Sequence, residues 1–216
     1  MDIASRLNRI RERIEVAAHS VGRDSTAVTL IAVSKTVGID AIREAYDAGQ
    51  RHFGESRLQE AMPKIEALPG DIVWHFVGTL QSNKAKRVAE RFDVIHTLES
   101  ESQLREIGKA GRVVDGLIEV NIANEPQKSG ISVKNLEAFA NSGLQYPSVH
   151  LRGLMTIGPP NLDPEAMRPF FRDLRTLGER IGGQWLSMGM SDDFEVAIQE
   201  GATHVRVGTA IFGSRS

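Results

Sequence analysis

The sequence predicts an α/β fold, a single (β/α)8 TIM-like barrel over residues 1–216 with an extra N-terminal helix. Two observations lead to this prediction. Short apolar segments of strand type alternate with segments of helix type along the chain, which is typical of a parallel sheet with helical crossovers. Eight such strands are present, and eight is the number that closes a parallel sheet into a barrel. The length of 216 residues is near the lower end for this fold and leaves little for a second domain.

The first segment, residues 1–20, is predicted to be an amphipathic helix that stands outside the repeats. Its apolar residues recur at helical spacing: Ile3, Leu7, Ile10, Ile14 and Ala17 or Ala18. Arginines in this segment suggest a transit peptide, but the acidic residues among them argue against one. No apolar run is long enough for a membrane span.

The strands and helices that follow are assigned from short buried-strand runs and from helical periodicity. The predicted strands are residues 28–34, 52–55, 72–77, 93–97, 116–122, 149–157, 184–188 and 203–207. The predicted helices are residues 39–48, 57–68, 83–91, 102–110, 133–142, 164–181 and 192–200, and a short tail follows the last strand. The loops at residues 124–126 and 159–161 follow strand ends. They therefore belong to the C-terminal face, where such barrels keep their active sites.

Composition excludes several classes of function. The chain has 26 basic and 28 acidic residues, so its net charge of −2 gives no reason to expect a nucleic-acid or membrane partner. It has no cysteine, which excludes disulfides, thiolate metal sites and cysteine nucleophiles and fits a cytoplasmic protein. The six histidines show no ligand spacing, so we expect no metal site. The basic residues Lys84, Lys86, Arg87 and Arg91 are interpreted as a solvated helix face.

A lysine stands at the end of the first strand. Residues 28–33 are apolar or β-branched, Ser34 and Lys35 follow, and Gly38 precedes the next helix. A strand that ends in a lysine is a way for a parallel barrel to present a reactive amine. Such an amine forms a Schiff base only when it is unprotonated, and apolar surroundings favour that form. The alternative is a lysine that ends a strand and extends into water.

The last two strands suggest a phosphate site. Loops after strands seven and eight of a barrel commonly bind phosphate through backbone N–H groups and a helix N-terminus. Gly189 permits close approach of the backbone to a ligand, and Gly208 and Thr209 can offer N–H groups and a hydroxyl. Ser191 fits a phosphate ligand and a helix N-cap equally well, with Asp192 and Asp193 favourable to the helix dipole in the second case.

Arg206 is a charged residue between two apolar neighbours on the last strand. If it points inward it needs an acceptor, because an unpaired buried charge is costly. A salt bridge with a carboxylate on a neighbouring strand, such as Glu119, is one way to supply it.

Eight segments together resemble the pyridoxal phosphate homeostasis protein family, which is similar to the barrel domain of bacterial alanine racemases. They occur in the same order over nearly the whole chain. They are AVSKT (residues 32–36), FGE (53–55), WHFVG (74–78), LQSNK (80–84), KSG (128–130), RGLMTI (152–157), SMGMS (187–191) and VRVGTAIFG (205–213). The resemblance implies a barrel of the alanine racemase N-terminal-domain type that binds pyridoxal 5′-phosphate (PLP).

The resemblance also implies roles for single residues. Lys35 would form a covalent aldimine with PLP, Arg206 would face the pyridine nitrogen, and Ser191, Gly208 and Thr209 would hold the phosphate. The family usually has asparagine near the cofactor ring where this chain has Ser56. Serine is shorter and lacks the amide, and a water molecule can fill the gap.

An arginine at the ring nitrogen bears on the type of reaction. Arginine has only donors and stays charged, so a nitrogen that accepts from Arg206 is unprotonated. A neutral pyridine is a weak electron sink, which disfavours transamination and decarboxylation but leaves racemisation open. In alanine racemases a tyrosine from a second domain serves as the opposite base. Tyr46 and Tyr146 are expected away from the C-terminal face, so that base is missing here.

These points favour a PLP-binding protein without catalytic residues that buffers or delivers the cofactor. The resemblance adds a role in vitamin B6 and amino-acid homeostasis, with PLP-dependent apoenzymes as candidate partners. We expect a cytoplasmic monomer that binds neither nucleic acid nor membranes. Two alternatives are a low-activity PLP-dependent amino-acid racemase and, without the resemblance, a Schiff-base aldolase acting on a phosphorylated sugar.

Overall fold

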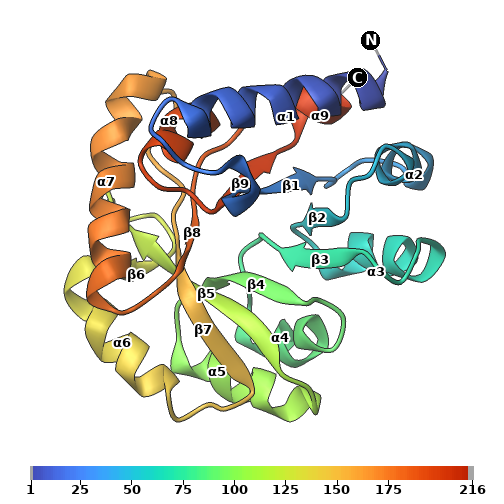
Figure 1. Ribbon diagram of the computed structural model, residues 1–216. Helices are drawn as coiled ribbons and strands as arrows, with labels where there is room; N and C mark the ends of the chain where they lie inside the picture. Colours follow the sequence, from blue (N-terminus) through green and yellow to red (C-terminus); the bar gives the residue numbers. More distant parts are fainter. Residues whose placement is uncertain (1, 214–216) are drawn as a thin grey trace.

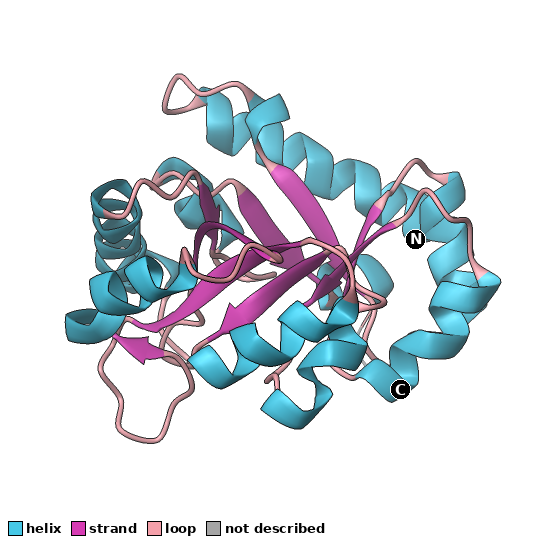
Figure 2. Cartoon of the chain, turned by 90° about the horizontal axis from the view of Figure 1, so that it is seen from below, coloured by secondary structure: helices cyan, strands magenta, loops and turns pink. Residues whose placement is uncertain are grey.

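Eight parallel strands form a closed ring with helices on its outside (Figures 1 and 2). The computed structural model describes residues 2–213. The ring consists of β1 (Thr29–Val33), β2 (His52–Glu55), β3 (Val73–Phe76), β4 (Val94–Leu98), β5 (Val114–Asn121), β7 (Val149–Met155), β8 (Trp185–Ser187) and β9 (His204–Val207). Pairing of β1 with β9 and of β4 with β5 completes the ring. A two-residue strand, β6 (Ile131–Ser132), pairs with β5 beside it.

Each strand-to-strand connection that crosses the outside of the ring contains a helix. The helices are α1 (Ile3–His19), α2 (Ile39–Asp47), α3 (Leu58–Ala67), α4 (Ser82–Ala89), α5 (Glu101–Ile107), α6 (Leu136–Gly143), α7 (Pro164–Arg180), α8 (Phe194–Gln199) and α9 (Thr209–Phe212). Short 3-10 turns occupy Ser25–Ala27, Gly108–Ala110 and Val133–Asn135. Within residues 2–213, none of the helices combines the length and the apolar character needed to cross a membrane.

The architecture confirms the predicted fold class, and all the predicted strands and helices are present with ends that shift by a few residues. Two elements were not foreseen. Residues predicted as a tail form α9, and β6 was missed. Both are too short to show a periodicity in the sequence.

The N-terminal helix α1 lies beside α8 and α9, the last two helices of the chain (Figure 1). All six apolar residues that predicted this helix are buried. Two arginines of α1 also bind residues of the C-terminal segments. Arg13 makes a two-pronged contact with Glu195, with N–O distances of 2.7 and 2.9 Å, and Arg6 donates to the carbonyl oxygen of Ile211. The helix thus covers the part of the barrel that is made last along the chain.

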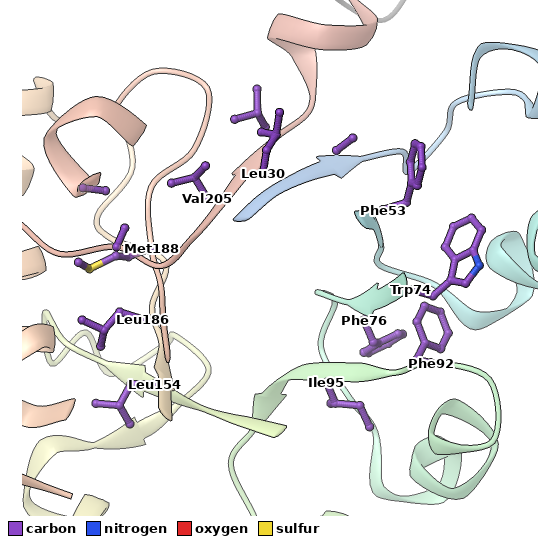
Figure 3. Packing of buried hydrophobic residues seen from close by; sticks show 14 of the residues in the cluster. Leu30, Phe53, Trp74, Phe76, Phe92, Ile95, Leu154, Leu186, Met188 and Val205 are labelled. Atoms are coloured by element: carbon purple, nitrogen blue, oxygen red, sulfur yellow. The ribbon is translucent and has the colours of Figure 1, made fainter. Parts of the chain in front are cut away.

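The main hydrophobic core lies between the barrel and its helices. Phe53 and Trp74 on one side, and Leu154 and Leu186 on the other, point away from the centre of the ring (Figure 3). Inside the ring, the apolar cluster is small and consists of Val94, Leu117 and Met155, with Val73 and Trp185 against it. Barrel interiors are usually filled by branched apolar side chains. Here much of the interior is polar, and the buried polar side chains there include His75, His96, Ser187, His204 and Arg206.

Gly153 is predicted to be essential for the contact between β7 and β8. A Cβ atom at this position would lie 2.0 Å from the carbonyl oxygen of Trp185, so the strands must separate to admit it. We expect Gly153→Ala to lower the free energy of unfolding by about 2–3 kcal/mol, as for other overpacked sites, in urea denaturation. Gly70→Ala is the matched control, because nothing lies within 4 Å of a Cβ there. Equal stability of the two variants would contradict the argument.

Candidate functional site

A pocket of about 480 Å³ opens where β1 and β9 end, on the C-terminal face of the barrel. Five of the six predicted site residues line it: Lys35, Ser191, Arg206, Gly208 and Thr209. These residues come from both ends of the chain and meet because β1 pairs with β9, with Ile31 opposite Arg206. The pocket is the one place where the predicted lysine, arginine and hydroxyl groups face a common space.

The predicted residue outside this pocket is Ser56, which follows β2. It is half-buried and lines a neighbouring pocket of about 730 Å³. The two pockets share Val77 and Ile157, so Ser56 lies across a common rim from the lysine pocket. Lys84 and Arg87 also line the larger pocket. Part of the basic face that was interpreted as solvated therefore borders a cavity.

Lys35 stands in a strained turn at the end of β1. The amide of Val37 donates to the carbonyl oxygen of Ser34 over 2.9 Å, which closes the turn around Lys35 and Thr36. Thr36 has a φ of 65°, a left-handed conformation that is an outlier for a β-branched residue. Lys35 itself is exposed. The structure therefore agrees with the alternative in which the lysine ends the strand and extends into water, because β1 ends at Val33 and the turn carries Lys35 to the rim of the pocket.

A buried ion pair supports this turn from below. The Nζ atom of Lys64 on α3 lies 2.7 Å from Oε1 of Glu55 and donates to the carbonyl oxygen of Ser34 over 2.9 Å. The hydroxyl of Ser34 donates to the same carboxylate oxygen over 2.6 Å. Glu55 is fully buried, and its second oxygen, Oε2, has no hydrogen-bond partner among residues 2–213. The network fixes β1, β2 and α3 together one residue before Lys35. Sequence reasoning missed it, although a lysine on the inner face of a helix is a usable signal.

The loops after β8 and β9 bring two hydroxyl groups together. Thr209 donates through Oγ1 to Oγ of Ser191 over 3.1 Å. Gly208 precedes α9, and the first N–H groups of a helix have no partner within it. A Cβ atom at Gly208 would lie 3.2 Å from the carbonyl oxygen of Val33, so glycine keeps the β9 loop close to the β1 end. Hydroxyls and free N–H groups in one pocket are suitable ligands for an anion.

The N-cap interpretation of Ser191 is wrong. The helix α8 begins at Phe194, and its N-cap residue is Asp193. The carboxylate of Asp193 accepts from the amide of Met190 over 2.6 Å, and burial raises its pKa. Asp192 is exposed. The hydroxyl of Ser191 is therefore not used as a helix cap and faces the pocket.

Arg206 is buried in the barrel without a carboxylate partner. It donates through Nη1 to Oγ of Ser187 over 2.6 Å and through Nη2 to the carbonyl oxygen of Thr156 over 2.9 Å. The suggested salt bridge with Glu119 is absent from the ion pairs of the described residues. Burial lowers the pKa of Arg206 to about 10, which leaves the guanidinium charged near neutral pH. Its Nε–H group has no acceptor among the described side chains and remains available to a ligand in the pocket.

Glu119 on β5 is a second buried charge that the site contains. It is 6% exposed, lines the larger pocket and accepts no hydrogen bond through its carboxylate from any described residue. Burial, and then the nearby charge of Glu99, raise its pKa to about 7. Sequence analysis considered Glu119 only as a partner of Arg206. A carboxylate between the apolar residues Ile118 and Val120, near the C-terminal end of the strand, is the signal that identifies it.

Three histidines connect the underside of Arg206 to the opposite face of the barrel. His52, His75 and His96 are joined ring to ring, and His96 contacts Ser187. His75 is a buried, hydrogen-bonded core histidine. Burial lowers the pKa of His75 and of His96 well below the usual histidine value. Among residues 2–213, no group of His, Asp or Glu side chains is arranged to hold a metal ion.

Comparison with sequence families matches residues 5–216 to the family described as alanine racemase, N-terminal domain. The chain is 43% identical to the pyridoxal phosphate homeostasis protein of Aquifex aeolicus, over 100% of this chain and 99% of that protein. It is also 43% identical to the pyridoxal phosphate homeostasis protein of Escherichia coli K12, over 99% of this chain and 97% of that protein.

Solved structures show the same relationships. PipY of Synechococcus elongatus with PLP bound is 38% identical and matches with a TM-score of 0.84, over 98% of this chain and 100% of that one. Alanine racemase of Corynebacterium glutamicum is 18% identical with a TM-score of 0.69, over 97% of this chain and 62% of that one. The second match shows a shared fold.

The ion pair beneath Lys35 yields a prediction for stability. Removing the charge of Lys64 leaves the buried carboxylate of Glu55 without its partner, and breaking such a pair typically costs about 3–5 kcal/mol. We expect Lys64→Met to lower the free energy of unfolding by this amount in urea denaturation. The double variant Glu55→Leu/Lys64→Met has no buried charge at this site and should recover most of the loss. A loss of less than about 1 kcal/mol in the single variant would show that the pair is not important.

The buried histidines predict that acid destabilises the protein. Burial lowers the folded pKa of His204 from 6.5 to about 4. The unfolded chain therefore binds more protons below pH 6.5, so this contribution to stability is complete above pH 6.5 and is lost as the pH falls towards 4. The loss is on the order of 3 kcal/mol for His204 alone.

We expect the urea midpoint to fall between pH 7 and pH 5 and to fall less in His204→Gln. Glu119 titrates with the opposite sign, because its folded pKa is raised. His150, which is exposed on the outside of the barrel, is the control position. If His150→Gln reduced the fall of the urea midpoint with pH as much as His204→Gln does, the fall could not be assigned to buried imidazoles.

Proposed function

The chain belongs to the family of pyridoxal phosphate homeostasis proteins, and we propose that it binds PLP in the lysine pocket and buffers or delivers it without turning over a substrate. The observation that carries the proposal is that Lys35, Arg206, Ser191 and Thr209 line one pocket. Family membership supports the role in vitamin B6 and amino-acid homeostasis. PipY, a homologue of similar length, binds PLP.

The pocket residues fit the three reactive parts of the cofactor. The hydroxyls of Ser191 and Thr209, with the N–H groups that begin α9 at Gly208, are suited to a phosphate. The free Nε–H of Arg206 is suited to an acceptor such as a ring nitrogen. The exposed amine of Lys35 is suited to covalent attachment of an aldehyde. Ser56 lies beyond the shared rim, and we propose that it reaches the ring through water.

The residues around the pocket favour carriage over catalysis. Bound PLP supplies a reversible covalent link to amines and a ring that can accept electrons. Arg206 has only donors, so it holds the ring nitrogen unprotonated and limits that electron-accepting capacity. Its bonds to Ser187 and Thr156 use neutral acceptors, and no carboxylate of the described residues is hydrogen-bonded to it, although Asp193 and Glu119 lie near its charge.

Among the described residues, no tyrosine lines either pocket of this face to serve as the partner base for racemisation. The hydroxyl of Tyr46 donates to Asp71 on the outside of the barrel, and Tyr146 lies between α6 and β7. Neither lines the lysine pocket or its neighbour. The low-activity racemase remains the alternative function, and it requires a base that the described residues do not provide at the pocket.

The position of Lys35 supports exchange with the surroundings. The residue is exposed, and the pocket adjoins the larger cavity that Lys84 and Arg87 border. Neither Lys84 nor Arg87 is ion-paired within the described residues, so both are available to an anionic group. We propose that PLP is loaded and released through this open side, and that recipient apoenzymes approach here.

The first prediction from this function concerns Lys35. We expect the purified protein to show a visible absorption band of covalently attached PLP and Lys35→Ala to lack it, because the amine is lost. The control is Lys109→Ala, which removes an exposed lysine that pairs with Glu106 and should keep the band. The measurement is an absorption spectrum before and after addition of PLP.

Two outcomes would reject parts of the proposal. Equal retention of PLP by Lys35→Ala would reject the covalent anchor, and no retention by the unaltered chain would reject PLP binding. Conversion of an L-amino acid to its D form, lost in Lys35→Ala, would favour the racemase over carriage.

A further inference from the structure

A continuous line of hydrogen bonds runs through the barrel from Arg206 to His52. Nη1 of Arg206 lies 2.6 Å from Oγ of Ser187, and that oxygen lies 2.9 Å from Nδ1 of His96. Nε2 of His96 lies 2.9 Å from Nδ1 of His75, and Nε2 of His75 lies 3.0 Å from Nδ1 of His52. We call these five residues the histidine chain. It uses every ring nitrogen except Nε2 of His52.

Strand register explains why the rings meet. His52 on β2 pairs with Val73, and His75 is two residues further along β3. His75 pairs with Val94, and His96 is two residues further along β4. Side chains two apart lie on the same face of a strand. The three rings therefore point inward and step along the barrel from one strand to the next.

The histidine chain links two pockets that lie on opposite faces of the barrel. His52 and His75 line a pocket of about 420 Å³ at the N-terminal face, with Asp93, Asp115 and His204. Arg206 lines the lysine pocket at the C-terminal face. His52 is half-buried, whereas His75 and His96 are fully enclosed. His52 is thus the solvent-accessible end of the histidine chain.

The chemistry of the end groups sets the direction of every bond. Arg206 can only donate, so Ser187 accepts from it. In the described residues the hydroxyl of Ser187 has one other neighbour, His96 Nδ1, to which it donates. His96 then donates through Nε2 to His75, and His75 through Nε2 to His52. All three imidazoles are neutral in this arrangement, and each inner nitrogen is satisfied.

We propose that the histidine chain is a positioning device that holds Arg206 toward the lysine pocket and that is released by protonation of His52 at the opposite face. The second part rests on the proposed function, since Arg206 matters as the group facing the cofactor ring. Ser187, His96 and His75 act on that site through Arg206 and do not touch the pocket.

Protonation of His52 reverses the donor–acceptor direction of the hydrogen bonds in the histidine chain. When His52 gains a proton at Nδ1, it donates to His75, which must then donate through Nδ1 to His96. His96 in turn donates through Nδ1 to Ser187. One proton is added and none is lost, and the positive charge stays on His52. The oxygen of Ser187 then receives two donors, and its own hydrogen has no acceptor among the described residues, which weakens its bond to Arg206.

The charges around the histidine chain favour protonation at His52 over protonation at His96. Burial disfavours the charged form of His52, and the nearby carboxylate of Asp93, which is itself paired with Arg112 over 2.9 Å, favours it. Asp115, the other carboxylate of the lower pocket, is paired with Arg152 over 2.7 Å. Burial, and then the nearby His75, His204 and Arg206, disfavour a charge on His96, and His204 also lines the lower pocket with His52. The outer histidine is therefore the one that accepts a proton first.

The first experiment tests the direction of the hydrogen bonds in the histidine chain, in the absence of cofactor. In cofactor-free protein with ¹⁵N-labelled histidine, nuclear magnetic resonance at pH 7.5 should show His52, His75 and His96 as Nε2–H tautomers. Lowering the pH until His52 titrates should convert His75 and His96 to Nδ1–H tautomers while they remain neutral. Nδ1–H tautomers at pH 7.5, or unchanged His75 and His96 while His52 titrates, would overturn the proposal. This result does not depend on whether PLP binds.

The second experiment measures PLP retention against pH. We expect Ser187→Ala to weaken PLP binding about tenfold at pH 7.5, as for the loss of a hydrogen bond to a charged group. In His52→Gln the weakening of PLP binding at lower pH should be lost, because the titrating end is gone, whether or not the affinity at pH 7.5 changes. The matched control is His204→Gln, which removes a buried imidazole of the same region that is outside the chain.

A pH profile of His52→Gln equal to that of the unaltered chain would overturn the proposal, as would a profile flattened by His204→Gln alone. A general loss of stability cannot imitate the expected result, because it would not remove the pH dependence of PLP binding in His52→Gln while leaving it in His204→Gln. If the unaltered chain fails to bind PLP, the proposed function is rejected, and the tautomer measurement still decides the hydrogen-bond direction.

Discussion

The positive charge of Arg206, buried inside the barrel, is the constraint on which the polar interior depends. A buried guanidinium costs several kcal/mol unless acceptors surround it. Neutral acceptors, the hydroxyl of Ser187 and the carbonyl of Thr156, satisfy two of its donors here. A carboxylate partner would have stabilised the charge better but would have neutralised it towards the pocket. The hydrophobic core outside the ring supplies the burial that offsets this cost.

The same constraint explains why the inside of this barrel is not filled with branched apolar side chains. Ser187 needs an acceptor for its hydroxyl, and each histidine in turn needs one for its N–H group. Polar residues thus extend from Arg206 to the solvent at the far face. The hydroxyl of Ser187 and the histidine N–H groups all have acceptors only if their hydrogen bonds run in one direction. The addition of a single proton therefore disturbs the whole series.

The sequence was sufficient for the fold and for most of the site, because both depend on local patterns. Strand and helix periodicities predict the repeats, and the ends of parallel strands share one face, which brings Lys35, Ser191 and Arg206 together. The Glu55–Lys64 pair and the histidine chain depend on strand register and on which face a helix buries. Spacing in the sequence does not determine these. The sequence left open whether Lys35 is enclosed or extends into water, because the strained turn at Thr36 that carries it to the rim is not visible in residue spacing.

The packing of α1 against α8 and α9 has a consequence for the order of folding. The residues that bind Arg6 and Arg13 lie 205 and 182 positions further along the chain. During synthesis the first helix must therefore wait for the last two before its apolar face is covered. The strand that carries Lys35 likewise pairs with β9, so the lysine pocket does not exist on a growing chain. The lysine pocket therefore forms only after β9 has been made, and a shorter growing chain exposes the apolar face of α1, which chaperones can recognise.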